Sequence, residues 1–367
     1  MTSFSRRDDE ASRALEAIEP DRVGAREEAL LLGLRAQPED LTRWREYAEA
    51  IAQALPEHAA RIRSACDRGD PASVLAGLLD TLPEELRAVV VALGRRDSVV
   101  STLWLAAEPF LAHHDALFRA APLVADLILS DATDAVGRLA LLPALRRYTA
   151  LSFSDTLFSN GGAGHLARSP HLGSLLHLGL IGTSLDDEDL SALFGSRAFP
   201  RLTSLDLSND REGQDYSLDG LQSLSGAAFA GTLEFLSMER RWFGPGVVSI
   251  LAALPRLEEV ELAGGALGDE GAVALAAMPR RWTRLGLGGN DIGDAGVVAL
   301  AGSEALAGLR WLDLGNNDLG DEGALALARS PFLAALESLQ LGRPKVSPET
   351  REALGARFGA RVKFDSP

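Results

Sequence analysis

The sequence has few of the residues that build disulfides, metal sites or nucleophilic sites. Its 367 residues include one cysteine, Cys66, and six histidines, of which only His113 and His114 are adjacent. One cysteine cannot form an internal disulfide, and adjacent residues of a helix point about 100° apart, a poor geometry for sharing a metal ion. Neither a Gly-Lys-Ser/Thr phosphate loop nor a His-Glu-x-x-His zinc motif occurs. We therefore expect no metal, no cofactor and no enzymatic activity.

Long apolar runs and an excess of basic residues are also missing. No stretch of 18 uncharged apolar residues occurs, and the first ten residues lack the apolar core of a signal peptide, so we expect a cytoplasmic protein. The chain has 52 acidic and 36 basic residues, which gives a formal net charge of −16. This charge would repel a phosphate backbone or an anionic lipid surface. Neither nucleic acid nor a membrane is therefore an expected partner.

Helical spacing marks residues 1–98 as a small all-α domain. Apolar residues recur three and four apart on one predicted helical face, made of Leu41, Trp44, Ala48, Ile51 and Leu55. Asp70-Pro71 and Thr81-Leu-Pro-Glu84 have the spacing of helix starts. Gly69 and Gly94 follow apolar-periodic stretches, where glycine commonly ends a helix.

The pattern changes near Arg95-Arg96-Asp97, and residues 99–367 repeat themselves. Leu-x-Leu-like cores recur every 24 to 31 residues, with first positions at Leu127, Leu151, Leu178, Leu205, Leu236, Val260, Leu285, Leu312 and Leu339. This period predicts a solenoid in which each unit supplies one strand and one return segment. We expect residues 1–98 and 99–367 to be separable domains, with caps at both ends of the solenoid. The longest gap predicts an extended surface loop over Asp210–Leu218.

Alternation within a repeat predicts which residues face the core. Leu312 and Leu314 are two apart and lie on one face of a strand, whereas Trp311 and Asp313 lie on the other. Asn317 follows where the chain leaves the strand, and its amide can satisfy backbone groups that the turn leaves unpaired. Asn290 holds the equivalent position, so we expect these two residues to form an asparagine ladder. Other residues replace asparagine in the remaining units, namely Thr156, Thr183, Asp210, Arg241, Gly265 and Pro344.

A second cassette follows several strands. Gly-Asp-x-Gly occurs at 268–271, 293–296 and 320–323, each time before a small-apolar helical pattern. Asp269, Asp294 and Asp321 stand where an N-cap carboxylate would accept from backbone N–H groups, and a calcium site along this row is the alternative interpretation. A helix in each unit predicts an α/β horseshoe with parallel strands inside and helices outside.

These repeats resemble the ribonuclease-inhibitor-like class of leucine-rich-repeat proteins, most strongly over residues 257–328. Residues 109–122 and 351–364 resemble the flanks of bacterial leucine-rich proteins that carry an N-terminal repeat-companion domain. Glu28-Ala29, Pro38-Glu-Asp40 and Tyr47-Ala-Glu-Ala-Ile51 match motifs of that companion in part, although its tryptophan is missing. The resemblance implies protein interaction rather than catalysis, and it implies no particular ligand.

Side chains on the outward strand face do not pack in the core, and they form the candidate binding surface. It combines two aromatic residues with a charged rim and consists of Phe235, Glu239, Arg240, Glu259, Glu261, Arg284, Trp311 and Asp313. The alternative is that Phe235 and Trp311 only cover neighbouring strands, since scattered exposed apolar residues are ordinary. We interpret Glu261 as an exposed rim acid, and expect a protein partner that is mildly basic with an apolar centre.

We therefore predict a non-enzymatic module or scaffold that binds a protein partner on the concave face. One alternative is a regulator that supplies an arginine, Arg240 or Arg241, to a nucleotide hydrolase. Another is a structural protein that assembles through its helical domain.

Overall fold

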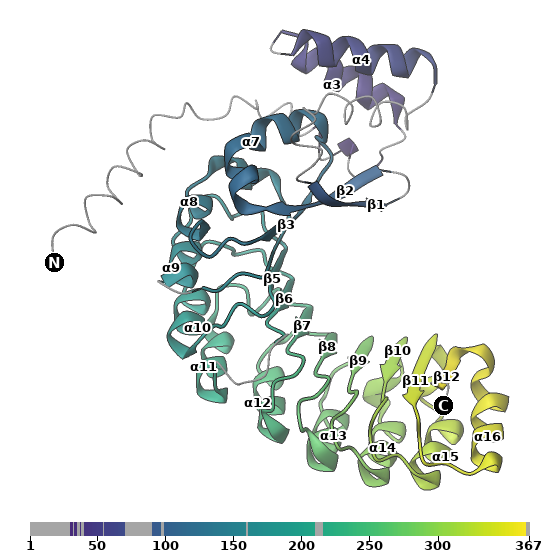
Figure 1. The fold of residues 1–367 in the computed structure, drawn as a ribbon. Coiled ribbons are helices and arrows are strands. Elements are labelled where there is room, and N and C mark those ends of the chain that lie inside the picture. Colours follow the sequence, from purple (N-terminus) through teal and green to yellow (C-terminus); the bar gives the residue numbers. More distant parts are fainter. Residues whose placement is uncertain are drawn as a thin grey trace, which may run out of the picture. The chain divides into compact units, whose positions relative to one another are not determined.

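A computed structural model describes most of the chain in two compact units, residues 1–177 and 178–367. The described residues are 30–31, 33–34, 37, 40–53, 55–69, 90–96, 99–158, 161–209 and 216–364, and for 90–96 and 99–101 only the backbone is described. Within each unit, strands are hydrogen-bonded in the order in which they occur in the chain. Figure 1 shows helices along one side of these strands.

The first unit begins with a helical region. Helices α3 (Leu41–Ile51) and α4 (Pro56–Asp67) pack on each other, and the Asp40 carboxylate caps α3 by accepting from the N–H groups of Thr42 and Arg43 at 2.9 and 3.1 Å. The predicted face of α3 is buried, with Trp44 at its centre. Gly69 ends α4 with a left-handed φ of 71°, as predicted. A helical region therefore precedes the repeats.

The helical region shares one apolar cluster with the first repeat-like unit. Trp44, Ile62 and Cys66 lie in this cluster together with Phe118 and Leu123, from the end of α7 (Ala107–Ala120) and just beyond it. Burial raises the pKa of the Cys66 thiol, which makes the reactive thiolate scarce. Cys66 is thus a packing residue, and the helical region packs against the C-terminal end of α7.

A hairpin replaces the helix that the sequence predicted around Gly94. Strand β1 (Val90–Arg96) pairs antiparallel with β2 (Val99–Ala106), with Leu93 opposite Leu103 and Arg96 opposite Val99. The prediction that Gly94 ends a helix is wrong, because paired valine-rich segments favour extended backbone over helix. The boundary expected near residue 98 falls between two strands that are hydrogen-bonded to each other. The predicted helix starts at Asp70-Pro71 and Thr81–Glu84 lie outside the described residues.

Parallel strands follow β2 in the first unit. They are β3 (Asp126–Ser130) and β4 (Ala150–Ser154), and Leu103, Leu127 and Leu151 are aligned across them. The return segments contain α8 (Val136–Ala140), η1 (Pro143–Arg147) and α9 (Gly162–Ala167). Strand β5 (His177–Leu180) spans the boundary of the two units.

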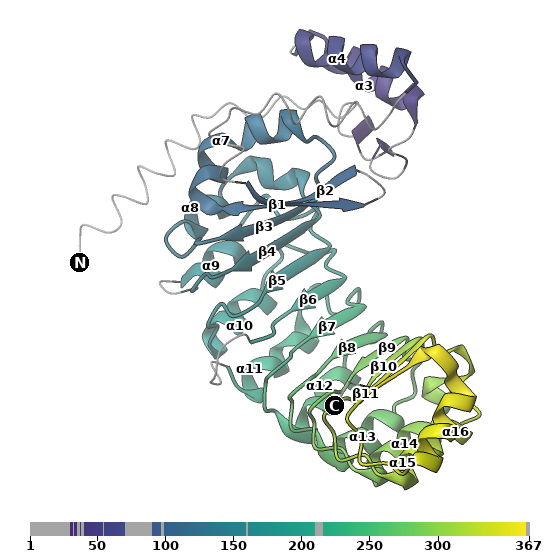
Figure 2. The same cartoon turned by 45° about the vertical axis from the view of Figure 1, so that its right-hand side comes forward.

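The second unit is a regular series of parallel strands, seen side by side in Figure 2. The strands are β6 (Ser204–Asp206), β7 (Phe235–Ser237), β8 (Glu259–Glu261), β9 (Arg284–Gly286), β10 (Trp311–Asp313), β11 (Ser338–Gly342) and β12 (Val362–Phe364). The helices are α10 (Asp187–Phe194), α11 (Leu218–Gln222), α12 (Val247–Ala252), α13 (Gly268–Ala276), α14 (Asp294–Ala301), α15 (Asp321–Arg329) and α16 (Pro348–Phe358). Short 3₁₀ turns complete the return segments at η3 (Ser223–Gly226), η4 (Gly244–Gly246), η5 (Glu304–Leu306), η6 (Leu333–Ala335) and η7 (Gly359–Arg361).

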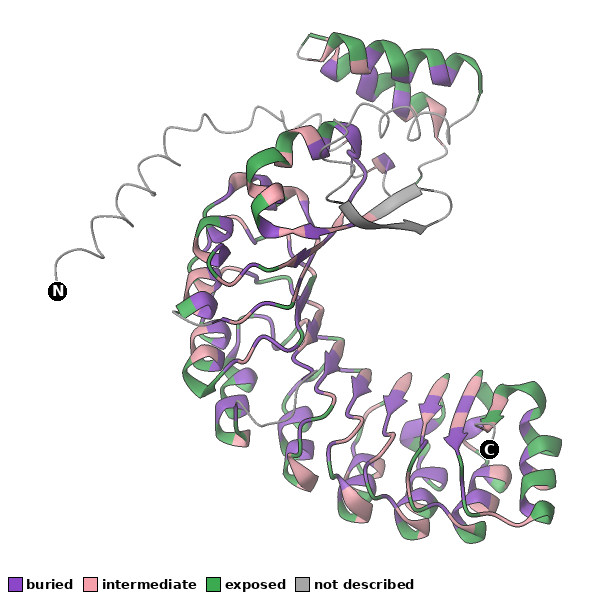
Figure 3. Ribbon diagram, viewed as in Figure 1, coloured by how far each residue is buried: buried purple, intermediate pink, exposed green. Residues whose placement is uncertain are grey.

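The core of each unit lies between its strands and its helices, where Figure 3 shows the buried residues. All nine predicted first positions lie in strands β3 to β11 and are buried. In the second unit, Leu236, Val260 and Leu285 are direct neighbours across β7, β8 and β9. The predicted α/β repeat architecture, with parallel strands on one side and helices on the other, is confirmed.

The aspartates of the Gly-Asp-x-Gly cassette lie in the first turn of one helix and bind the start of the next. Asp269 Oδ1 accepts from the N–H groups of Gly293 and Gly296 at 2.7 and 2.9 Å, although Asp269 itself belongs to α13. Asp294 does the same for Gly320 and Gly323 at 2.8 and 2.9 Å. The aspartates therefore accept from backbone N–H groups at helix starts, as expected, but each does so for the helix of the next repeat and not for the helix in which it lies.

Glycine at the fourth position of the cassette makes this contact possible. A Cβ atom on Gly296 would lie 2.7 Å from Asp269 Oδ1 and 2.9 Å from the Ala272 Cβ. Such distances are shorter than side chains tolerate, so a larger residue would push the helices apart. The Gly-Asp-x-Gly pattern thus indicates a hydrogen bond between repeats as well as a helix start.

The predicted loop over residues 210–218 is shorter than expected. Tyr216 is buried, and its hydroxyl donates to Leu207 O at 2.9 Å. Ser217 is the N-cap of α11, which begins at Leu218. Residues 210–215 lie outside the described residues. The ring of Tyr216 also lies 5.6 Å from that of Phe243, which explains why the end of this segment is packed.

Candidate protein-binding surface

Two rows of side chains cross the outward face of strands β7 to β11. The first contains Phe235, Glu259, Arg284, Trp311 and Ser338, and the second contains Ser237, Glu261, Gly286, Asp313 and Gln340. Each row follows from the parallel register, since side chains at equivalent positions of neighbouring strands lie side by side. Six of the predicted surface residues therefore share one face, and Glu239 and Arg240 follow the end of β7.

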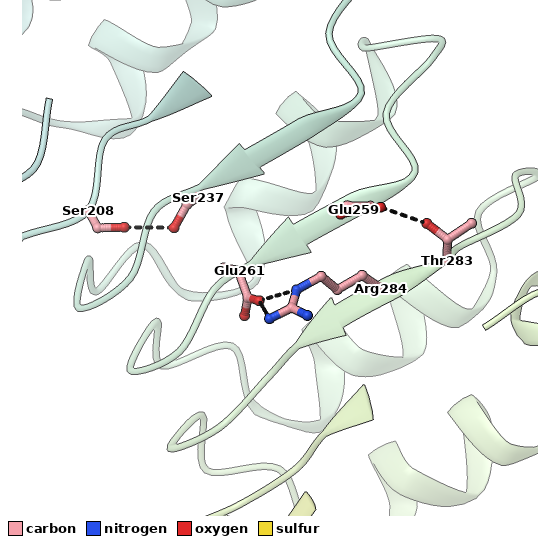
Figure 4. Close-up of polar contacts among 6 residues, drawn as sticks. All are labelled: Ser208, Ser237, Glu259, Glu261, Thr283 and Arg284. Carbon is pink, nitrogen blue, oxygen red and sulfur yellow. Dashed lines mark hydrogen bonds and ion pairs between the residues drawn. The ribbon is translucent and has the colours of Figure 1, made fainter. Parts of the chain in front are cut away.

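Glu261, Arg284 and Trp311 form one cluster on this face. The guanidinium of Arg284 donates to Glu261 Oε1 through Nε at 2.5 Å, and its Nη2 also lies 2.5 Å from that oxygen (Figure 4). The guanidinium carbon lies 3.6 Å from the centre of the Trp311 ring. An arginine held between a carboxylate and an indole is fixed both electrostatically and by cation–π contact. We refer to these three residues as the 261–284–311 cluster.

Gly286 provides the space for the Glu261 carboxylate. A Cβ atom at position 286 would lie 1.5 Å from Glu261 Oε2, so no other residue fits there with Glu261 in place. Glu261 is only 7% exposed as a consequence, and its interpretation as an exposed rim acid is wrong. The sequence contains the signal, because the outward position of β9 carries glycine where its neighbours carry Glu261 and Asp313.

Burial also determines how Glu261 titrates. Desolvation is the largest effect and raises the pKa of Glu261, Arg284 opposes it, and Glu239 and Asp313 raise it further. The pKa of this carboxyl therefore lies above its ordinary value despite the ion pair. Two further carboxylates thus act on Glu261 electrostatically, which makes this part of the face acidic.

The remaining charged residues surround the cluster. Glu259 and Asp313 are half-buried, and Asp313 Oδ1 accepts from the Gly315 N–H at 2.7 Å. The Thr283 hydroxyl lies 3.4 Å from Glu259 Oε1 (Figure 4). Since Arg284 is already paired with Glu261, the carboxylates leave this face with net negative charge.

Phe235 and Trp311 do not form one aromatic patch. Glu259 and Arg284 stand between them in the same row, so three strand spacings separate the two rings, about 14 Å. Both rings are half-buried. The structure therefore places Trp311 in the 261–284–311 cluster and leaves Phe235 at the other end of the row.

The turn after β7 differs from its sequence-based interpretation. Arg241 is 2% exposed, its guanidinium carbon lies 4.1 Å from the centre of the Tyr216 ring, and its Nε donates to Leu207 O at 3.4 Å. A buried arginine cannot reach into another protein, so its interpretation as a catalytic finger is wrong. Sequence analysis missed Trp242, which follows it and is 74% exposed.

Asn290 and Asn317 occupy the turns next to the candidate surface. Asn290 Oδ1 accepts from the N–H groups of Gly265 and Leu267 at 2.9 and 3.2 Å, and its Nδ2 donates to Leu262 O at 2.8 Å. Asn317 Oδ1 accepts from the N–H groups of Asn290 and Ile292 at 2.9 and 3.0 Å. Each asparagine thus satisfies backbone groups of the preceding repeat, and the two hold the strand exits in line.

Within the described part of the chain, no group of three or more His, Cys, Asp or Glu residues is arranged to hold a metal ion. His114 Nδ1 lies 3.2 Å from Asp115 Oδ1 on α7. Among the helices described, none has the length and apolar character needed to span a bilayer.

Three stretches of the second unit, residues 254–276, 283–301 and 309–328, match the family model described as Leucine Rich repeat. These three stretches are leucine-rich repeats, and the parallel strands of the second unit continue the same pattern on either side of them. No curated protein matches it significantly in sequence.

One solved structure supports this fold at low sequence identity. The chain is similar to a crystal structure of the Rad7 and Elc1 complex in yeast, with 15% identity, a TM-score of 0.57, and coverage of 98% of this chain and 89% of that chain. It is also similar to an internalin (inlF) of Listeria monocytogenes, with 15% identity, a TM-score of 0.38, and coverage of 80% and 93%. A TLR13-ssRNA13 complex gives 20% identity, a TM-score of 0.37, and coverage of 72% and 38%.

Proposed function

We propose that the protein is a non-enzymatic interaction module that binds a protein partner on the outward face of strands β7 to β10. The 261–284–311 cluster is the observation that carries this proposal, because it fixes a large aromatic side chain and an arginine on an open strand face. Aromatic and arginine side chains dominate the binding energy of many protein interfaces. Fixing both before binding lowers the entropy that association costs.

Charge defines the partner of this face. Glu239, Glu259 and Asp313 surround the cluster, and Arg284 is paired with Glu261. A complementary protein surface carries lysine or arginine around an apolar centre that covers Trp311. The partner is thus a protein with a basic rim, as the sequence suggested. The net charge of −16 supports the further proposal that nucleic acid and anionic membranes are not bound.

The helical region is proposed to cap the solenoid. Phe118 and Leu123 share the apolar cluster of α3 and α4, so removing the helices would expose that cluster to water. Domains of residues 1–98 and 99–367 remain our proposal, with the qualification that a cut at residue 98 separates β1 from β2. A fragment of residues 90–367 is therefore the better test of an independent solenoid. The Gly-Asp-x-Gly cassette supports assignment to the ribonuclease-inhibitor-like type.

The test of this function compares partner binding by matched variants. The full chain, Trp311→Ala and Val298→Ala are used to isolate partners from native cell extract, and the recovered partner is then titrated in purified form. Val298 is an exposed apolar residue of α14, on the helical side, and serves as the control. Trp311→Ala should weaken binding by about 2 kcal/mol or more, as expected for an anchor, whereas Val298→Ala should not. Equal binding by both variants would place the interface elsewhere.

A further inference from the structure

In seven repeats, the turn that leaves the strand has a left-handed residue five residues after the strand begins. The residues at this place have φ between 48° and 71°, and they are Asp131, Asp155, Gly182, Arg240, Gly264, Gly289 and Asn316. Glycine, asparagine and aspartate are the residues that tolerate this conformation, whereas a long side chain is strained there. Arg240, with φ of 57°, is the exception among them.

Nothing in the described protein explains why arginine stands at this place. The Arg240 side chain is exposed and makes no hydrogen bond, ion pair or ring contact with any residue that the structure describes. Its backbone N–H donates to Ala263 O at 2.6 Å, so the turn itself is held in place. A strained residue without a structural contact of its own is a candidate for a functional role.

The same turn exposes an aromatic residue. Trp242 is 74% exposed, while the equivalent places in the next three repeats carry Ala266, Asp291 and Asp318. The two residues that alternate with this pair point inward, since Arg241 is buried on Tyr216 and the Phe243 ring lies 5.6 Å from that of Tyr216. Arg241, which is buried, and Phe243, which is half-buried, therefore hold the turn against Tyr216, while Arg240 and Trp242 are exposed.

We propose that the Arg240–Trp242 turn is a second docking point, which binds an acidic segment of a protein partner. A partner carboxylate pairs with the Arg240 guanidinium, and an apolar or aromatic side chain beside it covers the Trp242 indole. Charge complementarity selects this occupant, because the turn presents an unpaired cation on a protein of net charge −16. Nucleic acid offers anionic groups too, but its continuous row of phosphates is repelled by the net charge of −16 more strongly than a short acidic segment is. This docking point goes beyond the strand face, which favours a partner of the opposite charge.

The experiment follows the indole N–H signals of the full chain by NMR, since the five tryptophans give five separate signals. Trp242→Phe and Trp311→Phe assign the signals of the turn and of the strand face. The probes are a blocked Glu-Glu-Phe-Glu-Glu peptide, a Lys-Lys-Phe-Lys-Lys peptide of the same length, and a single-stranded oligothymidylate. We expect the glutamate peptide to shift the Trp242 signal and not the Trp311 signal.

Variants of Arg240 separate binding from folding. Arg240→Glu should weaken binding of the glutamate peptide about tenfold or more, as expected for loss of a charge-assisted contact, whereas Arg240→Lys should retain most of it. Arg240→Gly should lose the same binding although its turn is less strained, so a folding defect cannot account for the loss. An unshifted Trp242 signal, a shift that Arg240→Glu preserves, or a response to oligothymidylate instead would overturn the proposal. The lysine peptide and the Trp311 signal report on the strand face independently, so failure of either site is recognised separately.

Discussion

The Trp311 ring lies 3.6 Å from the guanidinium carbon of Arg284, and the same guanidinium is ion-paired with Glu261. Trp311 is consequently both a surface residue and a structural neighbour of a charge pair. Truncating Trp311 therefore removes a structural contact as well as a candidate binding anchor.

Trp311→Ala should lower the free energy of unfolding by about 1 kcal/mol, because the cation–π contact with Arg284 is lost. A double-mutant cycle with Arg284→Ala, measured by denaturant unfolding, should give a coupling energy of similar size. The exposed ion pair of Arg310 and Glu337, at 3.6 Å, provides a control cycle with coupling below about 0.5 kcal/mol. Equal coupling in the two cycles would mean that the stacking contributes nothing measurable.

Gly286→Ala should destabilise the protein by about 1 to 3 kcal/mol, since the new Cβ overlaps the Glu261 carboxylate and forces it from its place. Adding Glu261→Ala should relieve most of this cost, because the clash is then absent. Gly308 is the control, since a Cβ there meets only Trp282 O at 3.7 Å. Thermal unfolding measures the stability of the single and double variants. A double variant no more stable than Gly286→Ala would show that the strain lies in the backbone.

The pKa of Glu261 predicts a specific pH dependence. Burial raises this pKa, so between the ordinary carboxyl range and the raised value the folded protein binds more protons than the unfolded chain. The contribution of Glu261 to stability therefore falls as pH rises through this window. Glu261→Gln removes the titration, so its stability relative to the natural protein should increase over the same window. A pH-independent difference between the two, measured by denaturant unfolding at several pH values, would show that the pKa is not raised.

Asn290→Ala should cost about 3 kcal/mol, because it leaves the N–H groups of Gly265 and Leu267 and the carbonyl of Leu262 without their partner in the core. Asp318→Ala, in the same row of turns, removes only an exposed ion pair with Lys345 and should cost less than about 0.5 kcal/mol. Chemical denaturation measures both. Similar values for the two variants would mean that water replaces the asparagine amide.

Arg240→Gly should stabilise the protein by about 1 kcal/mol, since glycine adopts a φ of 57° without strain. Arg240→Ala keeps the left-handed strain and should give no comparable gain. The thermal midpoints of the two variants distinguish relief of strain from removal of charge. If alanine stabilises as much as glycine, the arginine charge and not its backbone conformation is the unfavourable feature.

The repeats were predictable from sequence because every repeat places apolar residues at the same positions of its strand. Leu236, Val260 and Leu285 recur at one position, so a repeat that matches the pattern well predicts where the strands of the other repeats lie. Features that depend on a neighbour were not predictable from a single unit. Glu261 is buried because Gly286 lies in the next strand. Arg241 is buried because Tyr216 lies in the previous repeat. The β1–β2 hairpin was missed because its valines also fit a helical period.

The aspartate contacts between helices give the solenoid a direction. Asp269 belongs to the repeat that precedes the helix it caps, and Asp294 stands in the same relation to α15. A chain that folds as it is synthesised, N-terminal part first, has each carboxylate in place before the helix that needs it emerges. Each repeat can thus fold onto a preceding repeat that already supplies the carboxylate. A fragment that starts at Asp294 would begin with α14 but lack Asp269, the acceptor for the N–H groups at the start of that helix.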